Sequence, residues 1–441
     1  MKSQFLIASV GSGGGKTTFM LGLLRALQKK KVKVQPFKCG PDCIDTQYHK
    51  LISNSDSINL DTRLASSNHI QYIYNTYGER ADVCIVEGST GLFDGYRKEQ
   101  GSNAEIARLL HIPVILSVNA KGISYSVAPL LFGFKNFNPS VKIAGVVFTN
   151  VVSPSHFQQL KDACRDAGMV CLGYLPFDDK LRFPSRYSAL TVALKTELND
   201  IASRIAEQIE AHVDLHKLLD LCMRVFPCSY TLPCTSEAED RKECFRGNKK
   251  LRITVACDVA FNYLFQENLD RLSDMGRITC FSPIYSKELP DCDMLYLPGG
   301  VPELFARQLH RRKDLLKQIK DYVESGGKVL AECGGVALLA QSLISREGGS
   351  VYAMSGALPV SYTMEQASLK TGYRTIIYPG GELKGYEFHY AHIVANDGFN
   401  SVRKIYGPDG LESDTPIYRY KNVIAGQVRW YFGESDPWKL W

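Results

Sequence analysis

With 441 residues, the chain is too long for one ordinary hydrophobic core, and we expect two domains. A net charge of +6 suits anionic substrates such as ATP or polycarboxylates, but it is too small to indicate a nucleic-acid partner. The 13 cysteines form no C-x-x-C pair, no signal-peptide segment precedes the first strand, and no apolar run is long enough to span a membrane. We therefore expect a cytoplasmic protein without a disulfide framework.

The first predicted elements are a strand over residues 5–9 and a helix from Phe19, with a glycine-rich turn between them. Strand, glycine turn, Lys-Thr and helix is the order that a phosphate-binding loop requires. We expect Lys16 to reach the outer phosphates and Thr17 to offer its hydroxyl to magnesium. The usual spacing requires a glycine at position 10, where this chain has Val10. The predicted ATP-binding residues of the loop are Gly11, Ser12, Gly13, Gly14, Gly15, Lys16, Thr17 and Thr18.

Strands and helices alternate after this loop. Strands are expected over residues 32–37, 83–86, 113–118, 143–148 and 170–172, and helices over 104–110 and 157–167. Such alternation is typical of a mostly parallel, doubly wound sheet with ligands at the carboxyl ends of its strands. Acids fall at those ends: Asp42 and Asp45 after the second strand, Glu87 at the end of the third, and Asp94 in the following loop. The predicted metal site is therefore Thr17, Asp42, Asp45 and Glu87.

Two segments around these acids resemble a known family. GPDCIDTQYH and EGSTGLFDG are similar to the GPDYIDP-x-x-H and EG-x-x-GLFDG signatures of cobyrinic acid a,c-diamide synthase. The resemblance implies a dethiobiotin-synthetase-like, ATP-dependent domain that activates carboxylates. It also implies that Asp45 and Asp94 lie near the acceptor carboxylate or the metal, that Glu87 binds magnesium, and that Asn150 recognises adenine.

The middle of the chain indicates a domain boundary. Residues 196–216 predict an amphipathic helix with Ile201, Ile205, Ile209 and Val213 on one face. Residues 222–250 are rich in Pro, Cys and charge and show little periodicity. We therefore expect an ATP-binding domain over residues 1–200, a helix and linker over 201–250, and a second domain over 251–441.

Alternation restarts in the second half, with strands expected over residues 251–257, 294–297 and 328–332 and a helix over 336–343. Cys333 lies between a strand end and a helix start, with glycines after it. This pattern indicates a nucleophile elbow, in which a sharp turn presents the sulfur and the helix start favours the thiolate. The backbone N–H groups of Gly334 and of Gly299–Gly300 are the expected donors to an oxyanion, chiefly those of Gly300 and Gly334.

LYLPGGVPE, AECGG and GYEFHYAHI resemble the cobyrinate-type glutamine amidotransferase domain. The resemblance thus covers nearly the whole chain apart from the linker. It implies α/β architecture throughout, with two doubly wound domains: a P-loop domain followed by a class I (triad-type) amidotransferase domain of flavodoxin-like fold. It also implies that Cys333 attacks the glutamine amide, forms a thioester and releases ammonia.

The expected base of this second reaction is where the chain departs from the family. Counting through KNVIAGQVRWYFGES against a family segment resembling ASYVHLHF puts Arg429 at the expected histidine and Tyr431 at the second one. An arginine lowers the pKa of a nearby thiol but cannot take and return a proton. Three interpretations stay open: glutaminase activity is weak or lost and free ammonia is used, His389 or His392 supplies the base, or the local alignment is shifted.

The two halves indicate one chemistry, in which ATP converts a carboxylate to an acyl phosphate and ammonia displaces phosphate. The resemblance implies that the acceptor is a corrinoid, cobyrinic or hydrogenobyrinic acid, amidated on its a and c acetate side chains in cobalamin biosynthesis. Three alternatives stay open. The acceptor is sirohydrochlorin, nickel-sirohydrochlorin or sirohaem, the first half is a regulatory ATPase, or the second domain has no catalytic activity. We expect ATP, Mg²⁺, glutamine and a tetrapyrrole as ligands, a homodimer, and neither nucleic acid nor a membrane as partner.

Overall fold

The computed structural model describes residues 1–181, 183, 191–228, 251–378 and 381–441. Its contacts divide the chain into two compact units. The first contains the described residues up to 183 and from 192 to 228, and the second contains Thr191 and those from 251 onward. The predicted linker over 201–250 therefore lies partly in the first unit, and its residues 229–250 lie outside the described residues.

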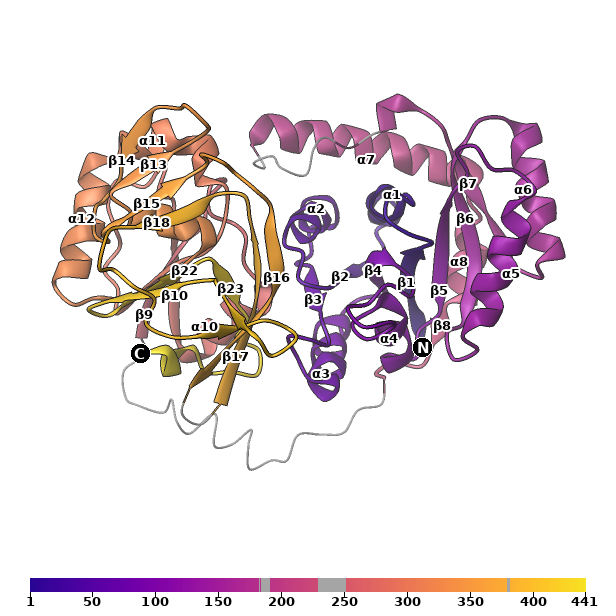
Figure 1. Cartoon of the computed structure of the whole chain (residues 1–441). Coiled ribbons are helices and arrows are strands. Elements are labelled where there is room, and N and C mark those ends of the chain that lie inside the picture. The colour runs from indigo at the N-terminus through magenta and orange to yellow at the C-terminus, as the bar shows by residue number, and fades with distance from the viewer. Residues whose placement is uncertain (182, 184–190, 229–250, 379–380) are drawn as a thin grey trace. The chain divides into compact units, whose positions relative to one another are not determined.

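The first unit is built on a sheet in the order β3–β2–β4–β1–β5–β6–β7, in which neighbouring strands are parallel (Figure 1). The strands are β1 (Lys2–Ser9), β2 (Val34–Cys39), β3 (Ile58–Leu60), β4 (Val83–Gly91), β5 (Val114–Asn119), β6 (Ile143–Val151) and β7 (Cys171–Pro176). The helices between them are α1 (Lys16–Lys29), α2 (Ile44–Ser53), α3 (Ser67–Gly78), α4 (Asn103–Leu109), α5 (Val127–Phe137) and α6 (Pro154–Asp166). Because β1 lies in the middle of the sheet, the loop after it reaches the centre of the rim where ligands bind.

The helix expected over residues 196–216 is α7 (Val192–His212), and its apolar face is buried in the first unit. It packs closely on α1, because a Cβ on Gly22 would lie 2.3 Å from Cγ2 of Ile205. After it come α8 (Leu215–Leu221) and β8 (Met223–Arg224), which pairs antiparallel with Lys2 and Ser3 of β1. The first unit therefore continues past residue 200, and its last segment returns to its first strand. The short helix η1 (Asp179–Leu181) precedes α7.

The second unit has a central sheet in the order β10–β9–β11–β12–β22–β21, parallel except for the edge strand β21. Its strands are β9 (Leu251–Ala256), β10 (Gly276–Phe281), β11 (Met294–Leu297), β12 (Lys328–Glu332), β21 (Ile417–Tyr420) and β22 (Val423–Gly426). Its helices are α10 (Gln266–Met275), η2 (Pro302–Phe305), α11 (Ala306–His310), α12 (Lys313–Glu324) and η4 (Pro437–Leu440). This sheet corresponds to the doubly wound domain predicted from the sequence.

Two further sheets in the second unit were not predicted. One, in the order β14–β13–β15–β18, contains β13 (Ser342–Ile344), β14 (Val351–Ala353), β15 (Val360–Thr363) and β18 (His392–Ala395). The other, in the order β20–β19–β16–β17–β23, is antiparallel and contains β16 (Lys370–Tyr378), β17 (Gly381–His389), β19 (Ile405–Tyr406), β20 (Glu412–Ser413) and β23 (Val428–Trp430). The strand that carries His389 therefore belongs to an antiparallel sheet.

The prediction of a helix over residues 336–343 is wrong. The short 3₁₀ helix η3 spans Cys333–Leu338, and β13 begins at Ser342. Residues 331–340 are all buried, so this segment has no polar face of the kind that a surface helix presents. It is also held closely, because a Cβ on Gly335 would lie 2.0 Å from the carbonyl oxygen of Leu297. No regular helix start therefore supports Cys333.

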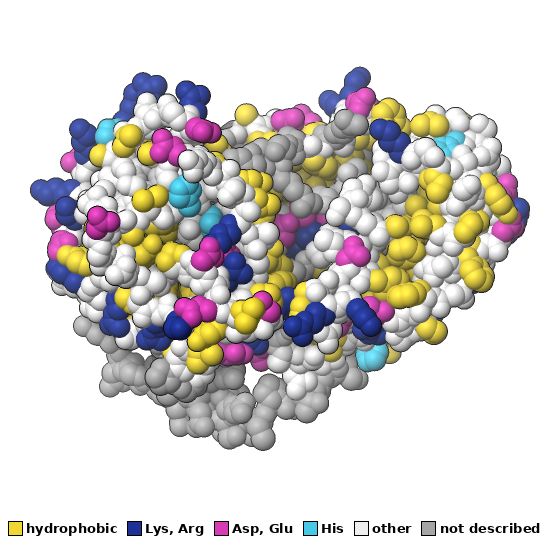
Figure 2. Space-filling view, in the orientation of Figure 1, with side chains coloured by type: hydrophobic (Ala, Val, Ile, Leu, Met, Phe, Trp, Pro, Cys, Tyr) yellow, Lys and Arg dark blue, Asp and Glu magenta, His cyan; other side chains and the backbone are white. Residues whose placement is uncertain are grey.

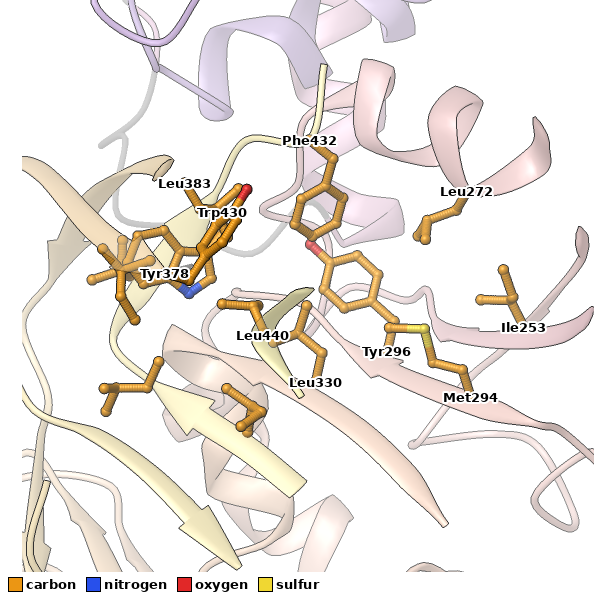
Figure 3. Packing of buried hydrophobic residues seen from close by; sticks show 14 of the residues in the cluster. Ile253, Leu272, Met294, Tyr296, Leu330, Tyr378, Leu383, Trp430, Phe432 and Leu440 are labelled. Carbon is orange, nitrogen blue, oxygen red and sulfur yellow. The ribbon is translucent and has the colours of Figure 1, made fainter. Parts of the chain in front are cut away.

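A hydrophobic core holds the second unit together around its central sheet (Figure 3). Ile253, Tyr296 and Leu330 come from three neighbouring strands and are almost completely buried. Trp430 of β23 and Phe432 after it complete this core, and the rings of Tyr296 and Phe432 lie 6.0 Å apart between centroids. The core thus joins the central sheet to the strand that contains Arg429.

The face drawn in Figure 2 carries Lys and Arg side chains interspersed with Asp and Glu. Mixed charge of this kind agrees with the small net charge of the sequence. None of the described helices combines the length and apolar content needed to cross a membrane.

Candidate active sites

The glycine-rich turn lies between β1 and α1, with Gly13 and Gly15 in the left-handed region at φ of 77° and 80°. A side chain at either position would strain the backbone, and a Cβ on Gly15 would also lie 2.7 Å from Cγ2 of Thr149. Lys16 Nζ donates a hydrogen bond to Ser9 Oγ at 2.8 Å. The loop therefore has the compact, backbone-exposing form that binds phosphate oxygens.

A pocket of about 430 Å³ opens beside this loop. Its lining includes Asp45 and Asn150, and a volume of this order suits a small-molecule ligand. Asn150 has a φ of 59°, and its Nδ2 donates to Asn119 Oδ1 at 2.9 Å. The lining residues are Gly13, Gly15, Thr17, Thr18, Asp45, Tyr48, Lys121, Thr149, Asn150, Leu175, Pro176, Phe177, Asp178, Leu181 and Phe183. The predicted loop residues Gly11, Ser12, Gly14 and Lys16 are not among them.

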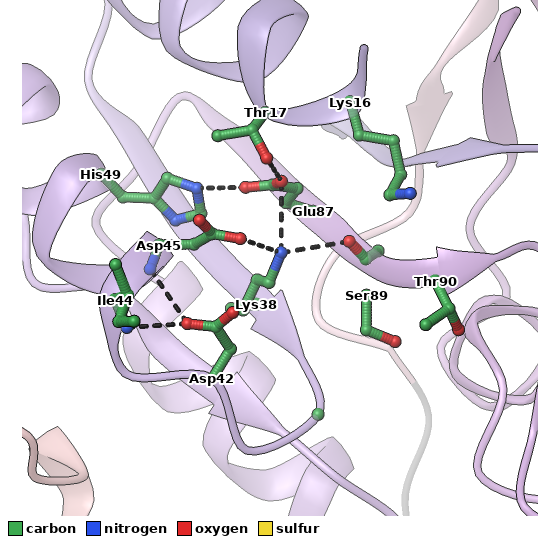
Figure 4. A network of polar contacts seen from close by, with 12 residues as sticks. Lys16, Thr17, Lys38, Asp42, Ile44, Asp45, His49, Glu87, Ser89 and Thr90 are labelled. Carbon is green, nitrogen blue, oxygen red and sulfur yellow. Dashed lines mark hydrogen bonds and ion pairs between the residues drawn. The ribbon is translucent and has the colours of Figure 1, made fainter. Parts of the chain in front are cut away.

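Lys38, at the end of β2, joins two of the predicted acids (Figure 4). Its ammonium lies 2.6 Å from Asp45 Oδ2 and 3.2 Å from Glu87 Oε1, and it donates to the carbonyl oxygen of Gly88 at 3.1 Å. All three charged side chains are almost fully buried. Burial lowers the pKa of Lys38, but the charges of Asp45 and Glu87 outweigh this and hold it above its ordinary value. Lys38 is therefore a buried cation that neutralises the carboxylates.

Glu87 receives hydrogen bonds on both of its oxygens. Thr17 Oγ1 donates to Oε1 at 2.5 Å, and His49 Nε2 lies 2.6 Å from Oε2. Burial raises the pKa of Glu87, but Lys38, His49 and Thr17 together lower it below its ordinary value. Glu87 is therefore ionised and held in one orientation.

Asp42 and Asp94, by contrast, bind their own local backbone. Asp42 Oδ1 accepts hydrogen bonds from the N–H groups of Ile44 and Asp45 at 2.7 and 3.1 Å. Asp94 Oδ2 accepts one from the N–H of Gly91 at 2.9 Å. The structure thus brings Thr17, Asp45 and Glu87 together, whereas these hydrogen bonds of Asp42 and Asp94 stabilise turns, and the charge of Asp42 also acts on Lys38.

The oxygen atoms in this first site fit a magnesium ion that is bound together with a nucleotide. Among the described residues, no group of three or more His, Cys, Asp or Glu side chains is arranged to hold a metal ion by itself. Magnesium in nucleotide sites usually takes one or two carboxylates, with phosphate oxygens and waters as its other ligands. Thr17, Asp45 and Glu87 offer a hydroxyl and two carboxylates of this kind.

Cys333, in the second unit, lies at the end of β12 with a φ of 45°, in the left-handed region that non-glycine residues seldom adopt. This strained turn is what a nucleophile elbow requires. The thiol donates to the carbonyl oxygen of Gln427 at 2.9 Å. The glycines predicted as oxyanion donors lie close by, since a Cβ on Gly334 would be 3.1 Å from the backbone nitrogen of Gly300.

His389 is bound within a buried polar cluster. Its Nε2 lies 2.8 Å from Glu387 Oε1, and its Nδ1 lies 2.6 Å from the carbonyl oxygen of Ala391. Gln427 Nε2 lies 3.2 Å from the same Nδ1, so Gln427 links this cluster to the thiol of Cys333. Both ring nitrogens of His389 therefore face oxygen atoms of residues two positions away in the sequence. His392 lies apart from this cluster, on β18, where it pairs with Thr363.

The two residues at the expected histidine positions are buried. The guanidinium of Arg429 lies 5.3 Å from the centroid of the Phe265 ring, and the hydroxyl of Tyr431 donates to Glu267. Each therefore has a packed environment of its own in the second unit.

Family models match both halves of the chain. Residues 5–190 match the CobQ/CobB/MinD/ParA nucleotide binding domain, and residues 252–435 match the CobB/CobQ-like glutamine amidotransferase domain. The cobyrinate a,c-diamide synthase of Caldanaerobacter subterraneus subsp. tengcongensis is 37% identical over 439 residues, which cover 96% of this chain and 94% of that protein. This chain belongs to the cobyrinate a,c-diamide synthase family.

Other members of this family are similarly close. The enzyme of Listeria innocua is 38% identical over 403 residues, covering 88% of this chain and 87% of that protein. The enzyme of Salmonella typhimurium is 34% identical over 444 residues, covering 98% of this chain and 95% of that protein. The predicted family is confirmed, and so is the α/β fold with a P-loop domain before an amidotransferase domain.

Sequence reasoning did not assign Lys38 or His49 to the first site. A signal for each was present, because Lys38 lies two residues before the motif GPDCIDTQYH, and His49 ends it. His49 also follows Asp45 by four residues on α2, which places both on one face of the helix. The pocket residue Lys121, in the loop after β5, was missed as well and has no comparable signal in the sequence.

Proposed function

We propose that this chain amidates the a- and c-acetate carboxylates of cobyrinic acid, with ATP to activate each carboxylate and glutamine to supply nitrogen. The similarity to cobyrinate a,c-diamide synthases along almost the whole chain carries this proposal. The same similarity does not favour sirohydrochlorin or sirohaem as the acceptor. The enzyme is accordingly a ligase that forms carbon–nitrogen bonds.

The first unit is proposed to carry out the activation. A carboxylate is a poor electrophile, and its oxygen therefore takes the γ-phosphoryl group of ATP, with ADP as the leaving group. Ammonia then attacks the acyl carbon, and phosphate leaves. The loop N–H groups and Lys16 are the proposed groups that stabilise phosphate charge, and Asp45, which lines the pocket, is proposed to lie where the acceptor would meet ATP. Magnesium, held by Thr17, Asp45 and Glu87, would neutralise charge on the phosphates.

The second unit is proposed to release ammonia from glutamine. The sulfur of Cys333 attacks the side-chain amide carbon, the nitrogen leaves as ammonia, and water hydrolyses the resulting thioester to glutamate. The backbone N–H groups of Gly300 and Gly334 are the proposed donors to the oxyanion. Arg429 cannot act as the base. The bonds of His389 to Glu387 and Ala391 support a structural role for that histidine.

Mass spectrometry of the product tests the proposed acceptor. Purified enzyme receives ATP, magnesium and glutamine, with cobyrinic acid and sirohydrochlorin present at equal concentration. The expected product is the diamide of cobyrinic acid. Preferential amidation of sirohydrochlorin would contradict the proposal, and so would full-rate ATP hydrolysis that needs neither tetrapyrrole.

The predicted homodimer, the cytoplasmic location and the absence of nucleic-acid partners stay predictions. Light scattering on the purified protein checks the first of them. A mass of one chain, 49.2 kDa, would contradict it.

A further inference from the structure

His49 is completely buried and does not line the nucleotide pocket. Its ring connects directly to Glu87, which is also buried and which reaches the pocket lining through its hydrogen bond from Thr17 (Figure 4). Nε2 lies 2.6 Å from Glu87 Oε2, and Nδ1 lies 2.9 Å from Ser57 Oγ at the start of β3. Both polar atoms of the ring thus have a partner, one on each side.

The two oxygens of Glu87 have different surroundings. Oε1 faces Thr17 and Lys38, and Thr17 lines the pocket. Oε2 faces His49. A neutral imidazole satisfies this geometry, with Nε2–H donating to the carboxylate and Nδ1 accepting from the Ser57 hydroxyl. In that arrangement His49 decides which oxygen of Glu87 is turned toward the nucleotide.

We propose that His49, held by Ser57, is the positioning residue that orients Glu87 for the magnesium of a bound nucleotide. This inference rests on the proposed function, because it assumes that Glu87 serves a magnesium–ATP site. The physical reason is that a hydrogen bond to the second oxygen of a carboxylate ligand fixes its orientation, and losing such a partner weakens metal binding. Without His49, Oε2 would be buried without this donor, and the carboxylate would lose the hydrogen bond that fixes its orientation beside Thr17 and Lys38.

ATP binding, measured by calorimetry at a series of magnesium concentrations, tests this role without any turnover. His49→Leu keeps most of the side-chain volume but removes the donor, and His49→Gln keeps a donor. We expect His49→Leu to raise the magnesium concentration for half-maximal ATP binding by about 10–100-fold, the usual cost of losing such a partner. For His49→Gln this magnesium concentration should be clearly closer to that of the wild type. Ser57→Ala should raise it as well, but by less than His49→Leu.

Tyr74→Phe is the matched control, because it removes a different buried hydrogen bond of the same unit, from Tyr74 Oη to Gln4 Oε1 at 3.0 Å. It should leave the magnesium dependence unchanged. Equal impairment by His49→Leu and His49→Gln, or a wild-type value in both, would overturn the inference. If His49→Leu does not fold, the other two variants decide. A wild-type magnesium concentration for half-maximal ATP binding in both His49→Gln and Ser57→Ala would overturn the inference. A raised concentration in Ser57→Ala alone would support the inference.

The wild type separates this inference from the proposed function. If wild-type ATP binding depends on magnesium and the variants share that dependence, only the role of His49 fails. If wild-type binding does not depend on magnesium, the proposed metal site fails and the inference fails with it.

Discussion

Lys38 and Lys50 make ion pairs of the same length in very different surroundings. Lys38 lies 2.6 Å from Asp45 with both side chains at most 2% exposed, and Lys50 lies 2.6 Å from Asp56 with both at least 43% exposed. Removing one partner of a buried pair leaves an uncompensated charge, whereas an exposed pair contributes little. The two lysines therefore form a matched comparison within one unit.

We expect Lys38→Met to lower the free energy of unfolding by about 3–5 kcal/mol, because Asp45 and Glu87 lose their shared cation. Lys50→Met should cost less than about 1 kcal/mol. Urea-induced unfolding of both variants and the wild type measures the difference. Equal losses would show that the burial of Lys38 does not matter energetically.

Glu332 gives a prediction about pH. Burial raises the pKa of Glu332 to about 8, although hydrogen bonds from Tyr296 and the N–H of Trp430 act in the opposite direction. The unfolded chain loses this proton near pH 4.5, and the folded protein keeps it to about pH 8. The contribution of Glu332 to stability is therefore complete at low pH and is lost as the pH rises through this window, by at most about 1.4 kcal/mol per pH unit.

Glu332→Gln keeps the shape of the side chain but does not titrate. Its free energy of unfolding, relative to that of the wild type, should therefore rise from about pH 4.5 to about pH 8. Urea-induced unfolding at a series of pH values measures this difference. A difference that stays constant with pH would show that the folded carboxyl titrates at its ordinary value.

Two helices of the first unit each contain a glycine, and their surroundings predict opposite effects for the same substitution. A Cβ on Gly22 of α1 would lie 2.3 Å from Ile205 of α7, whereas a Cβ on Gly133 of α5 would meet nothing within 4 Å. Gly22→Ala should therefore destabilise the unit by about 1–3 kcal/mol through overpacking. Gly133→Ala should stabilise it by up to about 1 kcal/mol, because alanine is the better helix former. Thermal unfolding of the two variants checks both signs.

The contact between α1 and α7 also shows which parts of the fold the sequence can predict and which it cannot. Apolar segments correctly placed most of the parallel strands, though not β3, β10 or β22, and the helix that became α7, because burial leaves a pattern in the sequence. That pattern does not say which element the face will cover, so α7 was assigned to a linker. The helix over 336–343 was wrong because a segment that is buried on every side has no such periodicity.

The same limit applies to the site. Thr17, Asp45 and Glu87 lie together, because loops after neighbouring parallel strands meet at one edge of a sheet, and their role in binding magnesium stays a prediction. Asp42 and Asp94 lie at the same edge, but their short side chains bind nearby backbone N–H groups. Sequence position alone does not reveal this competition between a ligand and the local turn.

At the scale of the whole molecule, the two proposed reactions are separable by their nitrogen source. Cys333→Ala should abolish amidation with glutamine and leave amidation with ammonium chloride near the wild-type rate. Product formation with each nitrogen source measures this. Cys280→Ala, which changes an exposed cysteine of the same unit, should affect neither rate.

Equal loss with both nitrogen sources would place Cys333 in folding rather than in ammonia supply. Equal wild-type rates with glutamine and ammonium chloride would show that Arg429 does not impair glutamine use. A wild-type enzyme that works only with ammonium chloride would indicate a second domain that has lost glutaminase activity.

The return of β8 to β1 also has a consequence for the order of synthesis. The ribosome makes β1 and the phosphate loop well before α7 and β8, which lie near the end of the unit. At about 5–20 residues per second, roughly 10–40 s separate the emergence of β1 from that of β8. During this interval the apolar surface of α1 around Gly22 has no cover from α7, so the nascent chain is most exposed to aggregation and most in need of chaperones while its nucleotide site is still incomplete.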